Sequence, residues 1–245
     1  MTGAERFEAL CKRDMETLHP RESIGTYKEK RLHRILKSYV CENKASFEIP
    51  VGNYVADIYE DGRITEIQTC RFDRLLPKLE YYLSDTDLSV TVVCPIIRNK
   101  RLIRIDPETG EILRQKLSPS HGKAADLLPE LYHIRQVIPN DRLKIKLMLI
   151  DAEEYRYSER VRYRRSGAYD SELFPTALVE ERDLSSVDDF LEFIPKTTDS
   201  FDATEYSKFI RQKGRDLYSS LNLLCHLKLL AKEKQGRKNI YKAGD

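Results

Sequence analysis

Residues 54–69 constrain the fold more than any other stretch of the chain, because they predict a β-hairpin whose register is fixed. Asp61-Gly62 lies between two segments of alternating apolar and polar residues, which is typical of a two-residue type I′ turn. The turn then sets four cross-strand pairs: Glu60 with Arg63, Tyr59 with Ile64, Ile58 with Thr65, and Asp57 with Glu66. The sequence therefore predicts two carboxylates that face each other across a hairpin.

Asp57 and Glu66 are an unusual pair for a purely structural sheet. Directly opposed side chains have Cβ atoms about 5 Å apart, and like charges at that spacing repel. A divalent cation held by oxygen ligands converts this repulsion into binding. Gln68 follows Glu66 by two residues and so points to the same face. The alternative is a solvated sheet face, and a longer loop would shift the register.

Composition and length narrow the class of protein. The chain has 245 residues, 40% of them hydrophobic and 33% charged, with a net charge of +2, so any nucleic-acid affinity must come from local basic patches. No apolar run approaches the roughly 20 residues of a membrane helix, and the N-terminus has no signal-peptide core. The five cysteines include no CxxC pair, which suits reduced thiols. We expect a cytoplasmic protein without an organic cofactor.

Hydrophobic periodicity predicts alternating helices and strands. We expect helices over residues 27–40, from Pro77 through Leu83, and over 125–138. Strands are expected over 46–51, at the hairpin, and over 87–97, 100–105 and 143–150. This order predicts an α/β fold with a mixed sheet flanked by helices.

These residues resemble the PD-(D/E)XK nuclease superfamily over roughly residues 25–105. The resemblance implies a restriction-endonuclease-like fold and a site for Mg²⁺ or Mn²⁺. It implies that Asp57 and Glu66 are metal ligands and that Glu29 is the assisting helix glutamate. Gln68 stands where the superfamily has its catalytic lysine, and Ala56 stands where proline is common.

Gln68 is the main departure from the superfamily pattern. Glutamine can hydrogen-bond a water or a phosphate but carries no charge. Lys78, Arg71 or Arg74 on the following helix would then supply the positive charge. Glu66-Ile67-Gln68-Thr69 also resembles the EIQT element of an uncharacterised bacterial family.

Two further segments are basic. Arg160, Arg162 and Arg164 would line one face of an extended segment, which suits either phosphate contacts or a charged edge strand. After residue 198, a capping box at Asp202–Glu205 predicts two helices followed by a hairpin, which resembles a winged helix. Its wing would carry Lys234, Arg237 and Lys238 toward DNA, although winged helices also mediate protein contacts.

We therefore expect a peripheral helix over residues 1–24, a nuclease-like core over 25–150, an Arg/Tyr-rich extension over 151–197, and a winged-helix-like domain over 198–245. The expected function is metal-dependent hydrolysis of DNA phosphodiester bonds. The alternatives are a catalytically inactive nucleic-acid-binding protein on the same scaffold and a protein-interaction module. DNA is the expected partner, no membrane is expected, and a homodimer is left open.

Overall fold

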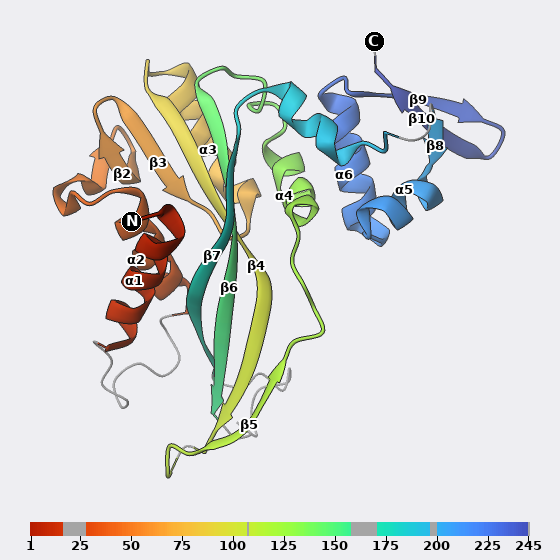
Figure 1. Cartoon of the computed structure of the whole chain (residues 1–245). Coiled ribbons are helices and arrows are strands. Elements are labelled where there is room, and N and C mark those ends of the chain that lie inside the picture. Colours follow the sequence, from red (N-terminus) through yellow and green to blue (C-terminus); the bar gives the residue numbers. More distant parts are fainter. Residues whose placement is uncertain (17–27, 107, 158–170, 197–199, 245) are drawn as a thin grey trace. The chain divides into compact units, whose positions relative to one another are not determined.

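The computed structural model describes residues 1–16, 28–106, 108–157, 171–196 and 200–244. Its helices and strands follow one another as shown in Figure 1. The α-helices are α1 (Gly3–Glu16), α2 (Lys28–Val40), α3 (Phe72–Ser84), α4 (Leu128–Leu131), α5 (Ala203–Ile210) and α6 (Gly214–His226). The strands are β1 (Phe47–Val51), β2 (Tyr54–Glu60), β3 (Arg63–Ile67), β4 (Ser89–Ile105), β5 (Ile112–Leu117), β6 (Leu143–Tyr157), β7 (Ser171–Leu184), β8 (Ser200–Asp202), β9 (Leu230–Gln235) and β10 (Lys238–Ala243). Short 3-10 helices are η1 (Lys44–Ser46), η2 (Ala124–Leu127), η3 (Tyr132–Ile134) and η4 (Val187–Phe193).

The larger sheet is mixed. Within the described residues it has seven strands in the order β1-β2-β3-β4-β6-β7, with β5 paired to β4. β2 and β3 are antiparallel, whereas β3 and β4 are parallel. The predicted α/β class with a mixed sheet flanked by helices is confirmed. β5 and β7 were not expected from the sequence.

The predicted hairpin register is confirmed over the paired positions of β2 and β3. The cross-strand partners are Ile58 with Thr65, Tyr59 with Ile64, and Glu60 with Arg63. Asp61 and Gly62 both adopt positive φ, at 49° and 75°, as a type I′ turn requires. The next position along the two strands is that of Asp57 and Glu66.

Pro77 does not begin α3 as predicted. The helix begins at Phe72, and Pro77 lies inside it with its side chain exposed. Leu75 and Leu79 on either side are buried, so the apolar face holds the helix together although Pro77 lacks the N–H for the carbonyl of Asp73. The preference of proline for a first helical position is outweighed here by burial.

Two other expected boundaries are wrong. The strands expected over residues 87–97 and 100–105 form one strand, β4. Asn99, between the two expected segments, donates to Asp151 of β6 from its backbone N–H (3.1 Å) and from its side chain (2.9 Å). The helix expected over 125–138 is broken into η2, α4 and η3. Pro129 lies in the first turn of α4, where the missing N–H of proline breaks no hydrogen bond within the helix.

Contacts divide the chain into two compact units. Unit 1 comprises residues 1–48, 95–123 and 148–181. In it, α1 packs beside α2, whose predicted apolar stripe is buried at Leu32, Ile35, Leu36 and Tyr39. Arg31 of α2 is 5% exposed and pairs with Asp14 at 2.9 Å and Glu172 at 2.6 Å, which ties α2 to α1 and to β7.

Unit 2 comprises residues 49–94, 124–147 and 182–245. Its C-terminal part is a three-stranded sheet, β8-β10-β9, with α5 and α6 between β8 and β9 in sequence. The predicted capping box is present, since Asp202 accepts the N–H of Glu205 at 3.0 Å and Glu205 accepts that of Asp202 at 2.8 Å. The predicted helices and hairpin after residue 198 are therefore formed.

Candidate functional site

Asp57 and Glu66 come together at the end of the β2–β3 hairpin. Oδ2 of Asp57 accepts the backbone N–H of Ile67 at 2.8 Å, which holds the Asp57 carboxylate beside the peptide that follows Glu66. The two carboxylates are close enough for the charge of Asp57 to act on the pKa of Glu66. The hairpin thus gathers two acidic groups on one face of the sheet.

Glu66 is a buried carboxylate with one satisfied and one unsatisfied oxygen. The residue is 3% exposed, and its Oε2 accepts a hydrogen bond from Lys78 Nζ at 2.6 Å. Its Oε1 is buried and has no hydrogen-bond partner in the described part of the chain. A buried carboxylate oxygen without a partner is costly, so Oε1 marks a position where a further ligand would be stabilising.

Burial raises the pKa of Glu66 to about 7, although the Lys78 ammonium acts to lower it. The negative charge of Asp57 raises that pKa further. Glu66 therefore titrates near neutral pH, as many residues in functional sites do.

Lys78 reaches this acidic pair from α3. Besides its ion pair with Glu66, its ammonium donates to the backbone carbonyl of Val55 at 2.6 Å. It also lies 6.0 Å from the centre of the Tyr82 ring. Lys78 was predicted, with Arg71 and Arg74 as alternatives, to supply the positive charge that Gln68 lacks. In the structure, its ammonium contacts the carboxylate of Glu66 and the backbone carbonyl of Val55.

The side chain of Gln68 forms hydrogen bonds within the turn between β3 and α3. Its side-chain Nε2 donates to the backbone carbonyls of Cys70 and Arg71, so both hydrogens of that nitrogen are used locally. Arg71 has a left-handed backbone with φ 60° immediately before α3, and the Gln68 amide helps to hold this conformation. The amide group expected to orient water or phosphate thus has a structural partner.

Other predicted residues are not brought to this pair by the described structure. Glu29 lies in α2, but its side chain is outside the described residues, as are Arg160, Arg162 and Arg164 in full. Lys234 is in β9, Arg237 is in the following turn, and Lys238 opens β10. The exposed Lys238 ammonium pairs with Asp202 at 2.7 Å, which partly neutralises its charge.

The donor set near Asp57 and Glu66 fits a hard divalent cation. Among the described residues, no group of three or more His, Cys, Asp or Glu could hold a metal ion. Mg²⁺, however, is commonly bound through one or two carboxylates, with waters and substrate phosphates completing its shell. Asp57 and Glu66 supply two such carboxylates, and the unpartnered Oε1 of Glu66 fits this role.

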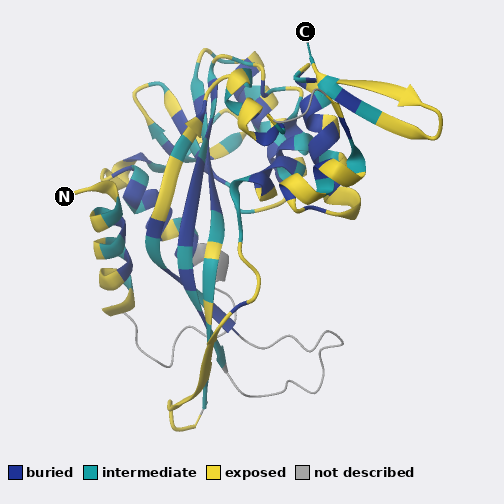
Figure 2. Cartoon of the chain, turned by 45° about the vertical axis from the view of Figure 1, so that its right-hand side comes forward, coloured by how far each residue is buried: buried dark blue, intermediate teal, exposed yellow. Residues whose placement is uncertain are grey.

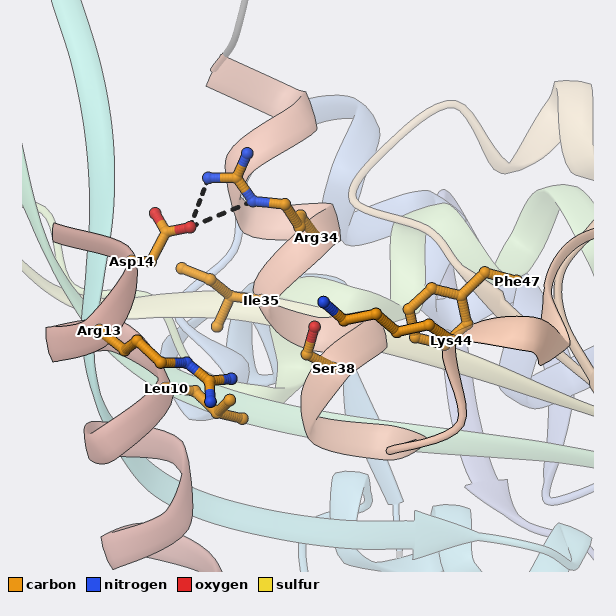
Figure 3. Close-up of a pocket in the computed structure, with 8 residues that line it drawn as sticks. All are labelled: Leu10, Arg13, Asp14, Arg34, Ile35, Ser38, Lys44 and Phe47. Atoms are coloured by element: carbon orange, nitrogen blue, oxygen red, sulfur yellow. Dashed lines mark hydrogen bonds and ion pairs between the residues drawn. The ribbon is translucent and has the colours of Figure 1, made fainter. Parts of the chain in front are cut away.

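The larger hollows described in the structure lie away from these residues in sequence and belong to unit 1. One of about 370 Å³ is formed by α1, α2 and the segment around η1. Figure 3 shows Arg34 bound to Asp14 on one side of it, with Arg13, Ser38 and Lys44 among the other lining residues. Neither Asp57 nor Glu66 lines this hollow.

A second group of basic residues escaped sequence analysis. Arg104 of β4, Arg114 and Lys116 of β5, and Arg156 of β6 line one hollow of about 150 Å³. The signal was present in the sequence as Arg114-Gln115-Lys116, where basic residues recur with the period of a strand. Without a predicted strand over residues 112–117, this period could not be interpreted.

Comparison with known proteins identifies the family to which this chain belongs. Residues 30–185 match the model described as a domain of unknown function (DUF8091), and the chain belongs to that family. An uncharacterised protein from Treponema pallidum (strain Nichols) is 28% identical over 163 residues. The match covers 65% of this chain and spans 64% of the length of that relative.

The family match includes Asp57, Glu66 and Lys78 but ends before η4 and the C-terminal part of unit 2. No solved structure matches the chain. In the portion of the chain that is described, no helix is both long and apolar enough to cross a membrane.

Proposed function

We propose that this protein is a divalent-metal-dependent nuclease that hydrolyses DNA phosphodiester bonds on a restriction-endonuclease-like fold. The observation that carries the proposal is the buried Oε1 of Glu66, which lacks a hydrogen-bond partner in the described structure while Asp57 lies beside it. A structural ion pair would need only Lys78 and Glu66. The carboxylate of Asp57 adds electrostatic repulsion to this pair, and a bound cation would offset that repulsion.

Each residue has a distinct role in this proposal. Asp57 and Glu66 would hold the cation, and the backbone carbonyl of Ile67 would be a further oxygen ligand. When bound, the cation polarises the phosphate and lowers the pKa of a water molecule. Lys78 supplies the positive charge that Gln68 lacks, because its ammonium is 2.6 Å from Glu66 Oε2. From there it would stabilise negative charge on a phosphate bound at the cation.

The order of elements supports the same class. A helix, α2, precedes an antiparallel hairpin that carries the two acids, and α3 then leads to the parallel strand β4. This order matches the resemblance to the PD-(D/E)XK superfamily stated from the sequence. Analogy of fold alone does not establish chemistry, so the proposal depends on the site. Gln68 differs from the superfamily lysine in charge and is engaged with Cys70 and Arg71.

The C-terminal part supports a contribution to binding. β8, α5, α6, β9 and β10 follow the order of a winged helix, with Lys234 and Arg237 exposed toward the tip of the β9–β10 hairpin. Basic wings contact the phosphate backbone without reading sequence. We therefore propose this part as a second DNA contact.

Cleavage of DNA tests the proposal. Supercoiled plasmid, linear duplex and branched DNA are incubated with the protein and Mg²⁺ or Mn²⁺. We expect Asp57→Asn and Glu66→Gln each to reduce cleavage on the order of 10²-fold or more, and Lys78→Ala to reduce it on the order of 10²-fold, since each removes a preorganised charge at the reacting phosphate. Addition of EDTA removes the metal and is expected to abolish cleavage.

Asp61→Asn is the matched control. It removes a carboxylate from the turn of the same hairpin, and asparagine suits the positive φ of 49° at that position. Cleavage that survives Asp57→Asn and Glu66→Gln refutes the assignment. DNA binding without cleavage by the wild type supports the inactive-scaffold alternative, which the engagement of Gln68 favours. If the wild type neither binds nor cleaves DNA, the protein-interaction alternative remains.

A further inference from the structure

The hairpin formed by β4 and β5 places two arginines directly opposite each other. Its antiparallel register pairs Arg104 with Arg114, Leu102 with Lys116, and Ile103 with Gln115. Like charges at directly opposed positions destabilise a pair of strands. The pairing of Arg104 with Arg114 therefore does not by itself stabilise the hairpin, and it places two positive charges close together.

Several cations share one face of this hairpin. Because side chains alternate along a strand, Arg104, Arg114 and Lys116 project to the same side. With Arg156 of β6 they line a hollow of about 150 Å³, and none of the described residues that line it is acidic. The whole chain has a net charge of only +2, so this face is a local concentration of positive charge.

Within the described part of the chain, acidic residues do not neutralise the two cations on β5. Neither Arg114 nor Lys116 has an ion-pair partner among the described residues. The nearby Glu154 is already used, since it accepts from Lys100 at 2.7 Å and from Arg156 at 3.0 Å. Burial acts to raise the pKa of Glu154, but these two cations outweigh it and lower that pKa to about 2.

β5 is open to solvent along its whole length. Each of its residues is exposed, and Figure 2 shows the strand in yellow from end to end. Same-face residues on a strand are about 7 Å apart, so Arg114 and Lys116 present a regular cationic row. A two-stranded ribbon fits the major groove of duplex DNA, and guanidinium groups pair well with phosphate oxygens.

We propose that the β4–β5 hairpin is a phosphate-binding ribbon for duplex DNA, in which Arg104, Arg114, Lys116 and Arg156 contact the sugar–phosphate backbone. The inference rests on the proposed nuclease function, because it names the surface that holds the substrate. Incoming phosphates neutralise the charges of Arg114 and Lys116, which have no ion-pair partner among the described residues. Binding at this ribbon depends on charge and not on base sequence.

Fluorescence anisotropy with a labelled 30-base-pair duplex tests the ribbon. It is measured in EDTA, so that cleavage plays no part. We expect Arg114→Gln to weaken binding roughly tenfold at 0.1 M salt and to reduce the salt slope of the affinity by about one. The double variant with Lys116→Gln should lose more. An unchanged duplex affinity in both variants would overturn the proposal.

Arg101→Gln is the matched control, because Arg101 lies on the opposite face of the same hairpin and its contact with Glu153 is long, at 3.7 Å. It removes the same charge and should leave binding within twofold. Equal losses of duplex affinity in Arg101→Gln and Arg114→Gln would show that only the net charge of the protein matters, and would overturn the proposal. If polyglutamate displaces the duplex at equal charge concentration, the surface binds acidic peptides and the proposal for duplex DNA is overturned.

Stability provides a second readout. Because Arg114→Gln relieves a like-charge pair, its thermal midpoint should equal or exceed that of the wild type, so lost binding cannot be attributed to unfolding. The two proposals fail separately. If the ribbon variants bind duplex as the wild type does and the wild type cleaves DNA, the ribbon proposal is refuted and the nuclease proposal stands. If binding depends on the ribbon but the wild type does not cleave DNA, only the nuclease proposal is refuted.

Discussion

At the scale of single residues, Glu66 connects the physical chemistry of the fold to its proposed chemistry. A carboxylate that is 3% exposed would normally be neutral or fully paired, yet Glu66 has Lys78 on one oxygen and no hydrogen-bond partner on the other within the described chain. Its pKa of about 7 means that modest changes in pH alter its charge. Both stability and metal affinity should therefore respond to pH.

Replacement of Lys78 by methionine should steepen the dependence of stability on pH. The ordinary pKa of Glu66 is 4.5 and the folded value is about 7, so the folded state binds more protons between these values. The stabilising contribution of the protonated form is complete below pH 4.5 and is lost as pH rises through 7, at a cost of roughly 3 kcal/mol. Lys78→Met removes the neighbouring cation, so the loss should extend to higher pH. Urea unfolding from pH 5 to 9 measures it.

Glu66→Gln is the control for that experiment, because it removes the titrating group and should flatten the profile over the same range. Parallel profiles for the wild type and Lys78→Met would contradict the assignment of Glu66 as the titrating group.

Binding of Mn²⁺ should strengthen with rising pH. A proton and a cation compete for Glu66, so affinity should increase up to tenfold per pH unit below a pKa of about 7 and level off above it. Isothermal titration of the wild type with Mn²⁺ at pH 6, 7 and 8 measures this dependence, and Glu66→Gln should bind weakly at every pH. Equal affinity at all three values in the wild type would show that Glu66 is not a ligand.

At the scale of elements, the short strands around the acids depend on two turns of different kinds. Gly62 closes the β2–β3 hairpin with φ +75°, and a Cβ there would meet no atom within 4 Å. Gly52 closes the β1–β2 turn with φ +61°, but a Cβ there would lie 1.9 Å from the hydroxyl of Tyr81 on α3. The first glycine is required by the backbone alone, whereas the second is required by packing as well.

Gly52→Ala should therefore destabilise the protein more than Gly62→Ala. We expect a loss of about 1 kcal/mol in the free energy of unfolding for Gly62→Ala, from backbone strain, and about 2–4 kcal/mol for Gly52→Ala, where Tyr81 must also move. Chemical denaturation of both variants gives the comparison. Equal losses would mean that Tyr81 yields without cost and that α3 does not hold the turn.

At the scale of the whole molecule, unit 2 combines segments that are distant in sequence. Gln212, between α5 and α6, is 6% exposed and donates to the carbonyl of Ala125 at 2.7 Å. The same side chain accepts from Ser220 at 2.7 Å. A buried hydrogen bond from Gln212 thus joins the C-terminal helices to the segment at residues 124–134, and a second orients the Gln212 side chain. Buried hydrogen bonds of this kind are costly to leave unmade.

Gln212→Leu should loosen both partners of this connection. The substitution leaves the Ala125 carbonyl and the Ser220 hydroxyl buried without a partner, which should cost about 2–4 kcal/mol. Hydrogen exchange followed by mass spectrometry should show faster exchange in residues 124–134 and in 203–226 together. Gln235→Leu, at the exposed end of β9, is the control. Faster exchange confined to 203–226 would mean that the two segments unfold independently.

Sequence alone determined the local features of this protein. The Asp61-Gly62 turn fixed the register of β2 and β3, and Asp202 with Glu205 fixed the start of α5, because each depends on residues a few positions apart. Tertiary structure decided the ion pair of Lys78 with Glu66, the use of Gln68 in the turn before α3, and the opposition of Arg104 and Arg114. Those contacts join residues whose spacing in sequence carries no period, so only the packing of whole elements brings them together.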